Sequence, residues 1–226
     1  MSQALDELYD KLNDKERKRA INTIAKSSNR LISYVNNLVD VSKLTTGIGY
    51  KASNMRCVNI SNLADKAIRR CQKLYIFLEE EDNRNFILNI EPNISAICDE
   101  YYISRAFENI IINAIQYCKS GTITITLAKI RNSSLNLNAN QDGSPNQNEH
   151  DKIIFSVKDE GIGIPPADLT NIFEPFMTST KTRTPAGGRG VGLALVKKVV
   201  ELHQGTVAVE SNNQGGSLLT ISLPVL

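Results

Sequence analysis

The 226-residue sequence predicts a two-layer α/β sandwich, a mixed sheet with helices on one face, preceded by a long helix. Three observations support this fold class. One apolar stripe repeats at three- and four-residue steps through the N-terminal part, helix-like and strand-like patterns alternate after residue 54, and two strand-like runs joined by a short glycine-containing turn end the chain. A hydrophobic content of 41% and a charged content of 22% are those of an ordinary globular protein.

The first organised segment is a helix that begins at Asn13 or Asp14 and ends at Gly47. Its single apolar stripe must be buried against other helices, most simply in an antiparallel hairpin or a dimeric bundle. Residues 4–12 carry a shorter apolar pattern, which predicts the tail of a preceding helix. Seven basic and two acidic residues lie between residues 11 and 30, which indicates either a solvated helix face or a docking surface for an acidic partner.

A linker around residues 47–54 precedes the α/β region, so the chain divides into residues 1–46 and 47–226. Helices are predicted over residues 61–78, 99–117 with Asp99 as its cap, and 194–202. Strands are predicted over residues 86–90, 95–98, 122–130, 152–158, 206–210 and 217–223. The stretch 132–151 is rich in Asn, Ser and Gln and cannot form a packed core, so we expect a mobile hairpin insertion without chemistry.

Composition excludes several classes of protein. A net charge of +2 gives no electrostatic reason to expect nucleic acid as the main ligand. The apolar runs are far shorter than the ~20 residues of a membrane span, and no cleavable secretory signal opens the chain. Four scattered cysteines without a Cys-x-x-Cys pair, together with two histidines, argue against a zinc site and a disulfide framework and favour reduced cytosolic thiols.

Two glycine-rich segments predict a ligand site, because glycine lets backbone approach a ligand closely. The run Asp159-Glu160-Gly161-Ile162-Gly163 follows a strand, so the Asp159 carboxylate can accept the exocyclic amine of an adenine; a tight turn with a capping Asp is the alternative. The run Gly188-Arg189-Gly190-Val191-Gly192-Leu193 leads into a helix, whose unpaired N–H groups favour phosphate; a flexible hinge is the alternative. The second run is neither a dinucleotide fingerprint nor a P-loop, since no strand precedes it and no Gly-Lys-Ser/Thr follows.

Asn109 and Asn113 lie one turn apart on the predicted 99–117 helix, on a different face from its apolar stripe. An Asn carbonyl oxygen is a suitable ligand for Mg²⁺, which takes its other ligands from water and phosphate. Buried Asn is also a common structural hydrogen-bonding residue. The pair by itself therefore leaves both roles open.

Taken in order, these motifs resemble the ATP-binding catalytic domain of sensor histidine kinases, part of the GHKL ATPase family. The resemblance covers residues 58–223, with the N-box, G1 box, F-box and G2 box at residues 108–114, 159–164, 173–176 and 188–193. Residues 27–44 resemble the second helix of the dimerisation and phosphoacceptor hairpin of these kinases, and residues 1–12 would end its first helix. The resemblance implies homodimerisation through the N-terminal helix, a response-regulator receiver domain as partner, and a cytoplasmic location, including that of the cytosolic part of a membrane-anchored sensor.

The resemblance also implies a site for ATP and Mg²⁺. Asn113 would ligate the metal, Asn109 would support it, and Asn109 and Glu108 are the candidate catalytic residues; a solvated or ion-paired side chain is the alternative for Glu108. Residues 177–187 would form a lid over the phosphates. The implied nucleotide-binding residues are Asn109, Asn113, Tyr117, Asp159, Gly161, Gly163, Lys181, Gly188, Arg189, Gly190, Val191, Gly192 and Leu193. For Lys181, Arg183 and Arg189 a solvated side chain is the favoured interpretation over a phosphate contact, and for Tyr117 a core or surface aromatic is an equal alternative to a contact with the base.

The sequence differs from the family pattern at two points. Gln116 stands where the family usually places Lys or Arg. Neither His150 nor His203 lies on a dimerisation helix, and His203 is expected to be structural, so the chain is expected to begin downstream of the acceptor histidine. We expect the intact kinase to phosphorylate a histidine and then a response-regulator aspartate, and this chain to bind MgATP without labelling itself. A GHKL ATPase that hydrolyses ATP and a noncatalytic nucleotide-binding module are the alternatives.

Overall fold

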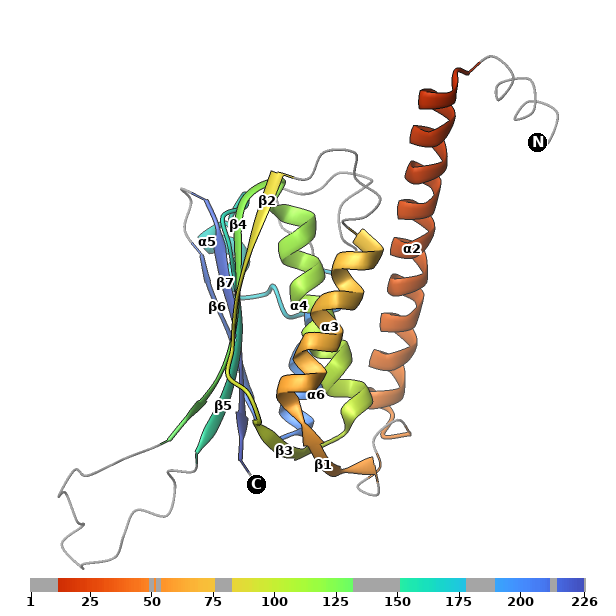
Figure 1. The fold of residues 1–226 in the computed structure, drawn as a ribbon. Coiled ribbons are helices and arrows are strands. Elements are labelled where there is room, and N and C mark those ends of the chain that lie inside the picture. Colours follow the sequence, from red (N-terminus) through yellow and green to blue (C-terminus); the bar gives the residue numbers. More distant parts are fainter. Residues whose placement is uncertain are drawn as a thin grey trace, which may run out of the picture.

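A computed structural model describes residues 12–48, 51, 54–75, 83–131, 151–177, 190–211 and 215–225. A twisted sheet forms one layer, helices α3, α4 and α6 cover one of its faces, and the long helix α2 runs along the outer side of these helices (Figure 1). The predicted two-layer α/β arrangement preceded by a long helix is therefore confirmed.

Helix α2 spans Asp14–Thr45 and begins with a capping box. The Asn13 side chain accepts a hydrogen bond from the backbone N–H of Glu16, whose carboxylate in turn accepts the N–H of Asn13. Within the described residues, the apolar stripe of α2 is largely uncovered, with exposed side chains at Ile21, Ile24, Leu31, Ile32, Val35 and Val39. The predicted end of a preceding helix falls mostly on residues 4–11, outside the described part of the chain.

Three helices pack their apolar faces on the sheet: α3 (Ile60–Tyr75), α4 (Glu100–Tyr117) and α6 (Gly192–Leu202). Asp99 caps α4 as predicted, because its carboxylate accepts the N–H groups of Tyr101 and Tyr102. Phe107 of α4 stacks on a phenylalanine of the sheet, Phe155, with 3.8 Å between ring centroids. Each fully buried side chain of this size contributes about 1.5–3 kcal/mol, so this contact helps fix α4 on the sheet.

The main sheet has five strands in the order β2-β4-β5-β7-β6. It is mixed, since β2 runs parallel to β4 and the other neighbours are antiparallel. Alternate residues of the central strands face the helices and are buried. The strands are β2 (Asn83–Ile90), β4 (Ser120–Ile130), β5 (Lys152–Asp159), β6 (Thr206–Ser211) and β7 (Ser217–Pro224).

The structure adds two elements that the sequence patterns did not predict. Strand β1 (Arg56–Asn59) pairs with β3 (Ser95–Cys98) in a separate two-stranded sheet, and α5 (Pro166–Leu169) is a single helical turn. Both are four residues long, too short for a periodic pattern to show. The insertion predicted over residues 132–151 lies outside the described residues except for Asp151, and the last three residues of the helix predicted over 61–78 lie outside them as well.

Candidate nucleotide-binding site

The Asp159 carboxylate occupies the end of β5 and is only 4% exposed. Ser217 lies directly opposite on β7, and its hydroxyl donates to Asp159 Oδ2 at 2.5 Å. The backbone N–H of Gly161 donates to Oδ1 at 2.8 Å. Burial raises the pKa of Asp159, and the hydrogen bonds from Ser217 and Gly161 oppose that rise. A carboxylate has about four acceptor positions, so one held by two protein donors can still accept an amine.

Gly161 brings the turn after β5 against the C-terminal end of α4. A Cβ at this position would lie 2.5 Å from the carbonyl oxygen of Tyr117 and 2.6 Å from Asp159 Oδ1, so a side chain does not fit. The N–H of Ile162 also donates to the Tyr117 carbonyl at 3.3 Å. Gly163 in the same turn has a φ of +69°, a conformation that favours glycine. The adenine anchor predicted at Asp159 therefore lies beside the end of α4.

Asn113 lies one turn before Tyr117 on α4, a rise of about 6 Å. Its side chain is half-buried, and it makes no hydrogen bond with another residue in the described part of the chain. A half-buried carboxamide without a protein partner is suited to bind a ligand, because an unpaired polar group is costly to bury. Tyr117 and Gln116 are also half-buried.

The glycine-rich G2 segment meets the middle of α4. Helix α6 begins at Gly192, and its N-cap residue Val191 supplies no side-chain hydrogen bond to the first turn. Val191 is 2% exposed and Leu193 packs against the core, so only the backbone N–H groups of this turn are suited to a phosphate. A Cβ on Gly192 would lie 2.8 Å from Asn109 Oδ1. The phosphate turn predicted here is therefore in contact with Asn109.

These contacts place the predicted site residues in one order along α4. Tyr117 meets the turn after Asp159, Asn109 meets the helix N-terminus at Gly192, and Asn113 lies between these two residues along α4. The eight residues from Asn109 to Tyr117 span about 12 Å of helix. The order adenine anchor, metal candidate and anion-binding turn is the order of the parts of a nucleoside triphosphate with its metal.

The residues that the structure describes on either side of positions 178–189, which include most of the predicted lid, lie together. The N–H of Phe176 donates to the Gly190 carbonyl at 2.9 Å, and a Cβ on Gly190 would lie 2.1 Å from the Met177 carbonyl oxygen. Both Phe176 and Gly190 have a φ of +66°. Residues 178–189 lie outside the described residues, so the predicted positions of Lys181, Gly188 and Arg189 are untested.

Glu108 and Asn109 are both buried, at 4% and 5% exposure. The Glu108 carboxylate forms ion pairs with Arg70 of α3 at 3.3 Å and Arg105 of α4 at 3.2 Å. The ion-paired alternative for Glu108 is thus the one that the structure contains. Asn109 Oδ1 accepts a hydrogen bond from Asn37 of α2 at 2.6 Å. The sequence motifs gave no sign of these partners, because the contacts join three separate helices.

His203 ends α6 and connects it with the start of α4. Its Nδ1 lies 2.8 Å from the Val199 carbonyl, so Nδ1 carries the proton, and its Nε2 accepts the N–H of Asp99 at 3.0 Å. Burial lowers the pKa of His203. These contacts agree with the structural role expected for this histidine.

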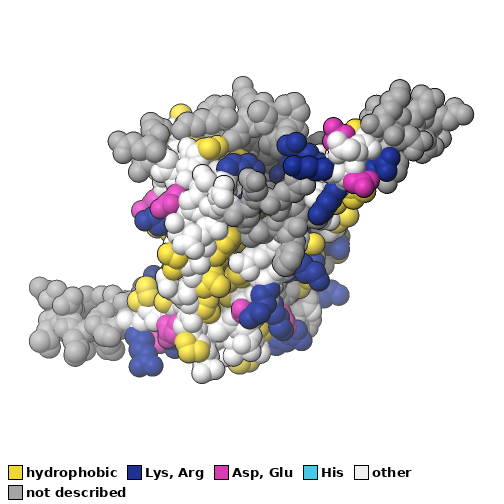
Figure 2. Space-filling model, turned by 45° about the horizontal axis from the view of Figure 1, so that its top comes forward, with side chains coloured by type: hydrophobic (Ala, Val, Ile, Leu, Met, Phe, Trp, Pro, Cys, Tyr) yellow, Lys and Arg dark blue, Asp and Glu magenta, His cyan; other side chains and the backbone are white. Residues whose placement is uncertain are grey.

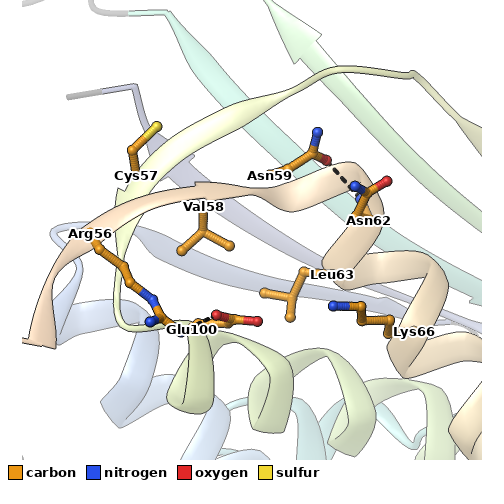
Figure 3. A pocket seen from close by; sticks show the side chains of 8 residues that line it. All are labelled: Arg56, Cys57, Val58, Asn59, Asn62, Leu63, Lys66 and Glu100. Atoms are coloured by element: carbon orange, nitrogen blue, oxygen red, sulfur yellow. Dashed lines mark hydrogen bonds and ion pairs between the residues drawn. The ribbon is translucent and has the colours of Figure 1, made fainter.

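A cavity of about 400 Å³ lies elsewhere, between β1, the first turns of α3 and the start of α4 (Figure 3). Arg56 points across it toward Glu100, with which it forms an ion pair, and Val58 and Leu63 lie between them and Asn59. Glu100 is thirteen residues from Asn113, or about 20 Å along α4. The cavity therefore contains none of the predicted nucleotide-binding residues.

In the described residues no helix combines the length and the apolar character needed to cross a bilayer. Curated relatives match over most of the chain. The sensor-like histidine kinase SenX3 of Mycobacterium tuberculosis is 29% identical over 88% of the chain, and the sensor histidine kinase WalK of Bacillus subtilis is 30% identical over 86%. The matched regions make up 43% and 28% of those two proteins, so the chain spans less than half the length of either.

Solved structures have the same fold. The Acinetobacter baumannii histidine kinase AdeS aligns over 99% of this chain and 92% of its own, with a TM-score of 0.61 and 20% identity. A full-length ShkA in complex with AMPPNP aligns over 96% of this chain and 40% of its own, with a TM-score of 0.63 and 22% identity. Residues 98–226, more than half of the chain, match the family described as histidine kinase-, DNA gyrase B- and HSP90-like ATPase, and the chain belongs to that family.

Proposed function

We propose that this chain is the ATP-binding catalytic part of a sensor histidine kinase, which binds MgATP and supplies the γ-phosphoryl group to a histidine on a dimerisation hairpin. The observation that carries the proposal is the order of groups along α4. The Asp159 turn contacts Tyr117 and the phosphate turn contacts Asn109. Asn113, whose side chain has no hydrogen bond within the described residues, lies between them along the helix. Sequence relatedness to SenX3 and WalK supports the same assignment.

Asn113 is the residue proposed to hold Mg²⁺. Its half-buried carboxamide fits this ion, which needs only one or two protein oxygens beside water and phosphate. The metal supplies charge neutralisation at the phosphates. The protein residues then bind and orient: Asp159 accepts the adenine amine, and the first-turn N–H groups of α6 hold phosphate oxygens. Lys181, Arg189 and Gly188 are proposed to complete the phosphate contacts.

Kinase chemistry is favoured over ATP hydrolysis by the residues on α4. A hydrolysing relative would need a Glu general base four residues before the metal-binding Asn, and Asn109 stands at that position. The adjacent carboxylate, Glu108, is held by two arginines and is buried. Phosphoryl transfer to histidine needs mainly positioning and charge neutralisation, which these residues can provide.

We propose that α2 contributes to the surfaces through which the intact kinase binds its partners. The exposed apolar stripe of α2, which the described residues leave uncovered, supports packing against a hairpin partner helix and dimerisation. Figure 2 shows Lys and Arg side chains gathered on the projecting end of α2, which carries Lys15, Arg17, Lys18 and Arg19. A basic surface beside the acceptor helix suits an acidic partner, and we propose a response-regulator receiver domain.

Incubation with γ-labelled ATP tests the proposal. The chain alone is expected to bind ATP but to acquire no label, since His203 is 4% exposed at the far end of α6 and cannot approach a phosphate in line. Addition of the histidine-bearing hairpin as a separate polypeptide should give acid-labile label on the hairpin. Steady-state ATP hydrolysis without transfer would favour an ATPase, and nucleotide binding with neither transfer nor hydrolysis would favour a noncatalytic nucleotide-binding module; either outcome contradicts the proposal.

A further inference from the structure

Glu160 lies directly after β5, where the chain leaves the main sheet. The last residue of β5, Asp159, lies opposite Ile123 of β4, so the next pair of the ladder would be Glu160 and Thr122. The backbone N–H of Glu160 still donates to the Thr122 carbonyl at 3.1 Å. One half of that pair is therefore made by the two backbones, as in a regular antiparallel ladder.

The other half of the pair is made by the Glu160 side chain. In a regular pair the Thr122 N–H would donate to the Glu160 backbone carbonyl, but here it donates to Glu160 Oε2 at 2.7 Å. Gly121, the preceding residue of β4, leaves room for this carboxylate, since a Cβ there would lie 2.8 Å from the same oxygen. The side chain thus takes the place of the peptide oxygen, and the peptide after Glu160 is free to leave the sheet.

The turn that follows depends on this early departure from the sheet. The Gly161 N–H donates back to Asp159 Oδ1 at 2.8 Å, and the Ile162 N–H donates to the Tyr117 carbonyl at the end of α4 at 3.3 Å. A bond from an Asp side chain to the N–H two residues later is an Asx-turn, which an extended strand does not allow. Glu160 therefore ends the strand at the position that lets Asp159 receive this bond.

The contacts of Asp159 determine the direction in which it can bind a ligand. Its carboxylate is 4% exposed, and Oδ1 accepts from Gly161 while Oδ2 accepts from Ser217. A buried carboxylate held at both oxygens has one orientation, so the lone pairs left for an adenine amine point in a fixed direction. The Glu160 side chain is exposed and bonds to β4, so it affects the ligand only through the turn that it holds.

We propose that Glu160 is a positioning residue for adenine selectivity: its carboxylate ends the β5 ladder at Thr122 and so holds the Asp159 turn in the geometry that accepts the 6-amino group of adenine. This inference rests on the proposed function, in which Asp159 binds that group. Glu160→Gln keeps an acceptor oxygen for the Thr122 N–H and should behave as the parent does. Glu160→Ala removes the acceptor and should release the turn.

The far end of β4 provides a matched control. Glu91 directly follows β2, and its N–H donates to the Leu127 carbonyl at 2.9 Å while its Oε2 accepts the Lys129 N–H at 2.9 Å. A carboxylate replaces a peptide oxygen here in the same way. Lys129 is seven residues from Thr122, or about 23 Å along the strand, so Glu91→Ala removes an equivalent bond far from the candidate site.

The turn can be measured without nucleotide by amide hydrogen exchange, resolved for single residues by NMR spectroscopy. The Gly161 N–H should exchange at least about fivefold faster in Glu160→Ala than in the parent, as expected from loss of one hydrogen bond that holds the turn. Glu160→Gln and Glu91→Ala should leave the exchange of Gly161 unchanged, and Glu91→Ala should speed only that of Lys129. An unchanged Gly161 rate in Glu160→Ala overturns the inference.

Adenine selectivity is measured by calorimetry with ATP and with purine riboside triphosphate, which lacks only the 6-amino group. The parent should bind ATP about 5- to 150-fold more tightly than the analogue, the range for loss of a hydrogen bond to a charged acceptor. Glu160→Ala should reduce this ratio at least about threefold and leave the affinity for the analogue within about twofold. Glu160→Gln and Glu91→Ala should keep the ratio of the parent.

The outcomes separate the inference from the proposed function. A ratio that Glu160→Ala leaves unchanged overturns the positioning role, and so does an equal loss of affinity for both nucleotides, which is the result of a merely structural role. A parent that binds both nucleotides equally, or binds neither, contradicts the adenine anchor of the proposed function. The Gly161 exchange rate then still shows whether Glu160 holds the turn.

Discussion

The Asp159→Asn substitution is expected to weaken the binding of ATP and ADP alike and to leave the nucleotide-free fold intact. In the structure, Asp159 accepts from Gly161 and Ser217. The Gly161 N–H can only donate, so the amide oxygen of the variant must face it and the amide nitrogen must face the Ser217 hydroxyl, which can turn to accept. The atom presented to the adenine amine on that side then becomes a donor in place of an acceptor.

The size of the effect follows from the bond that is lost. A hydrogen bond to a charged acceptor in a buried site is worth about 1–3 kcal/mol. At about 1.4 kcal/mol for each factor of ten, the dissociation constants of ATP and ADP should rise about 5- to 150-fold. Because the triphosphate is not involved, the ratio of the two constants should stay the same.

The Asp159→Asn substitution should raise the stability of the nucleotide-free protein or leave it unchanged. Burial raises the pKa of Asp159, so its ionised form is disfavoured by folding. A group whose folded pKa is raised contributes stability below its unfolded pKa and loses it as the pH rises through the folded pKa. At neutral pH the Asp159→Asn variant escapes that cost, and its nucleotide-free melting temperature should equal or exceed that of the parent.

Isothermal titration calorimetry and thermal unfolding of the same samples provide the assay. The matched control is Asp14→Asn, the same chemical change at an exposed acid of the first turn of α2; it should leave nucleotide binding unchanged and lower the melting temperature only slightly, through loss of a helix-terminal charge paired with Arg17. Ser217→Ala removes one donor to Asp159 and should weaken binding by less than the Asp159 change. Unchanged nucleotide binding, or a loss of binding that parallels a fall in melting temperature, would refute the reasoning.

Three further outcomes are expected. Asn113→Ala should remove most of the Mg²⁺ dependence of ATP binding but spare adenosine, as titrations with and without Mg²⁺ would reveal; a retained Mg²⁺ effect would exclude Asn113 as the ligand. Gly161→Ala places a Cβ 2.5 Å from the Tyr117 carbonyl, so ATP affinity should fall about tenfold or more through displacement of the turn. Calorimetry should compare it with Gly47→Ala, which strains the backbone at a φ of +73° but whose Cβ meets nothing within 4 Å, so that ATP affinity should be unchanged. Burial lowers the pKa of His203, so the unfolded chain binds its proton first: stability is present above pH 6.5 and is lost on acidification from 6.5 toward the folded pKa, by at most about 1.4 kcal/mol per pH unit. Urea unfolding should show that slope in the parent and lack it in His203→Gln.

The elements that the sequence predicted best are those that short-range chemistry determines. The caps at Asn13 and Asp99 act within three residues, and both helix starts were predicted to within a residue. The central strands β4 and β5 alternate buried residues with half-buried or exposed ones over six or more positions, which periodicity detects. Strand β1, with four residues and one buried side chain at Val58, has no such pattern, and only its pairing with β3 makes it a strand.

The candidate site likewise contains residues that local motifs predict and partners that they do not predict. Asp159, Gly161 and Asn113 belong to local motifs, and the structure brings their segments together. The partners Ser217 and Asn37 lie 58 and 72 residues from the groups that they bind. The first depends on the register between β5 and β7, and the second on how α2 packs against α4. Neither the strand register nor the helix packing is encoded in a short run of residues, so sequence motifs do not predict these partners.

The structure gives a different physical reason for the glycines of the candidate site than the one that the sequence predicts. The glycine pattern of the sequence predicts close approach of backbone to a ligand, but in the structure the atoms that exclude a Cβ are protein atoms. At Gly161 they are the Tyr117 carbonyl and Asp159, and at Gly190 the Met177 backbone. These glycines therefore let two turns and the F-box close on one another and on α4. A side chain there would displace a whole segment rather than fill the nucleotide's space, so its cost should appear in the melting temperature of the nucleotide-free protein as well as in ATP affinity.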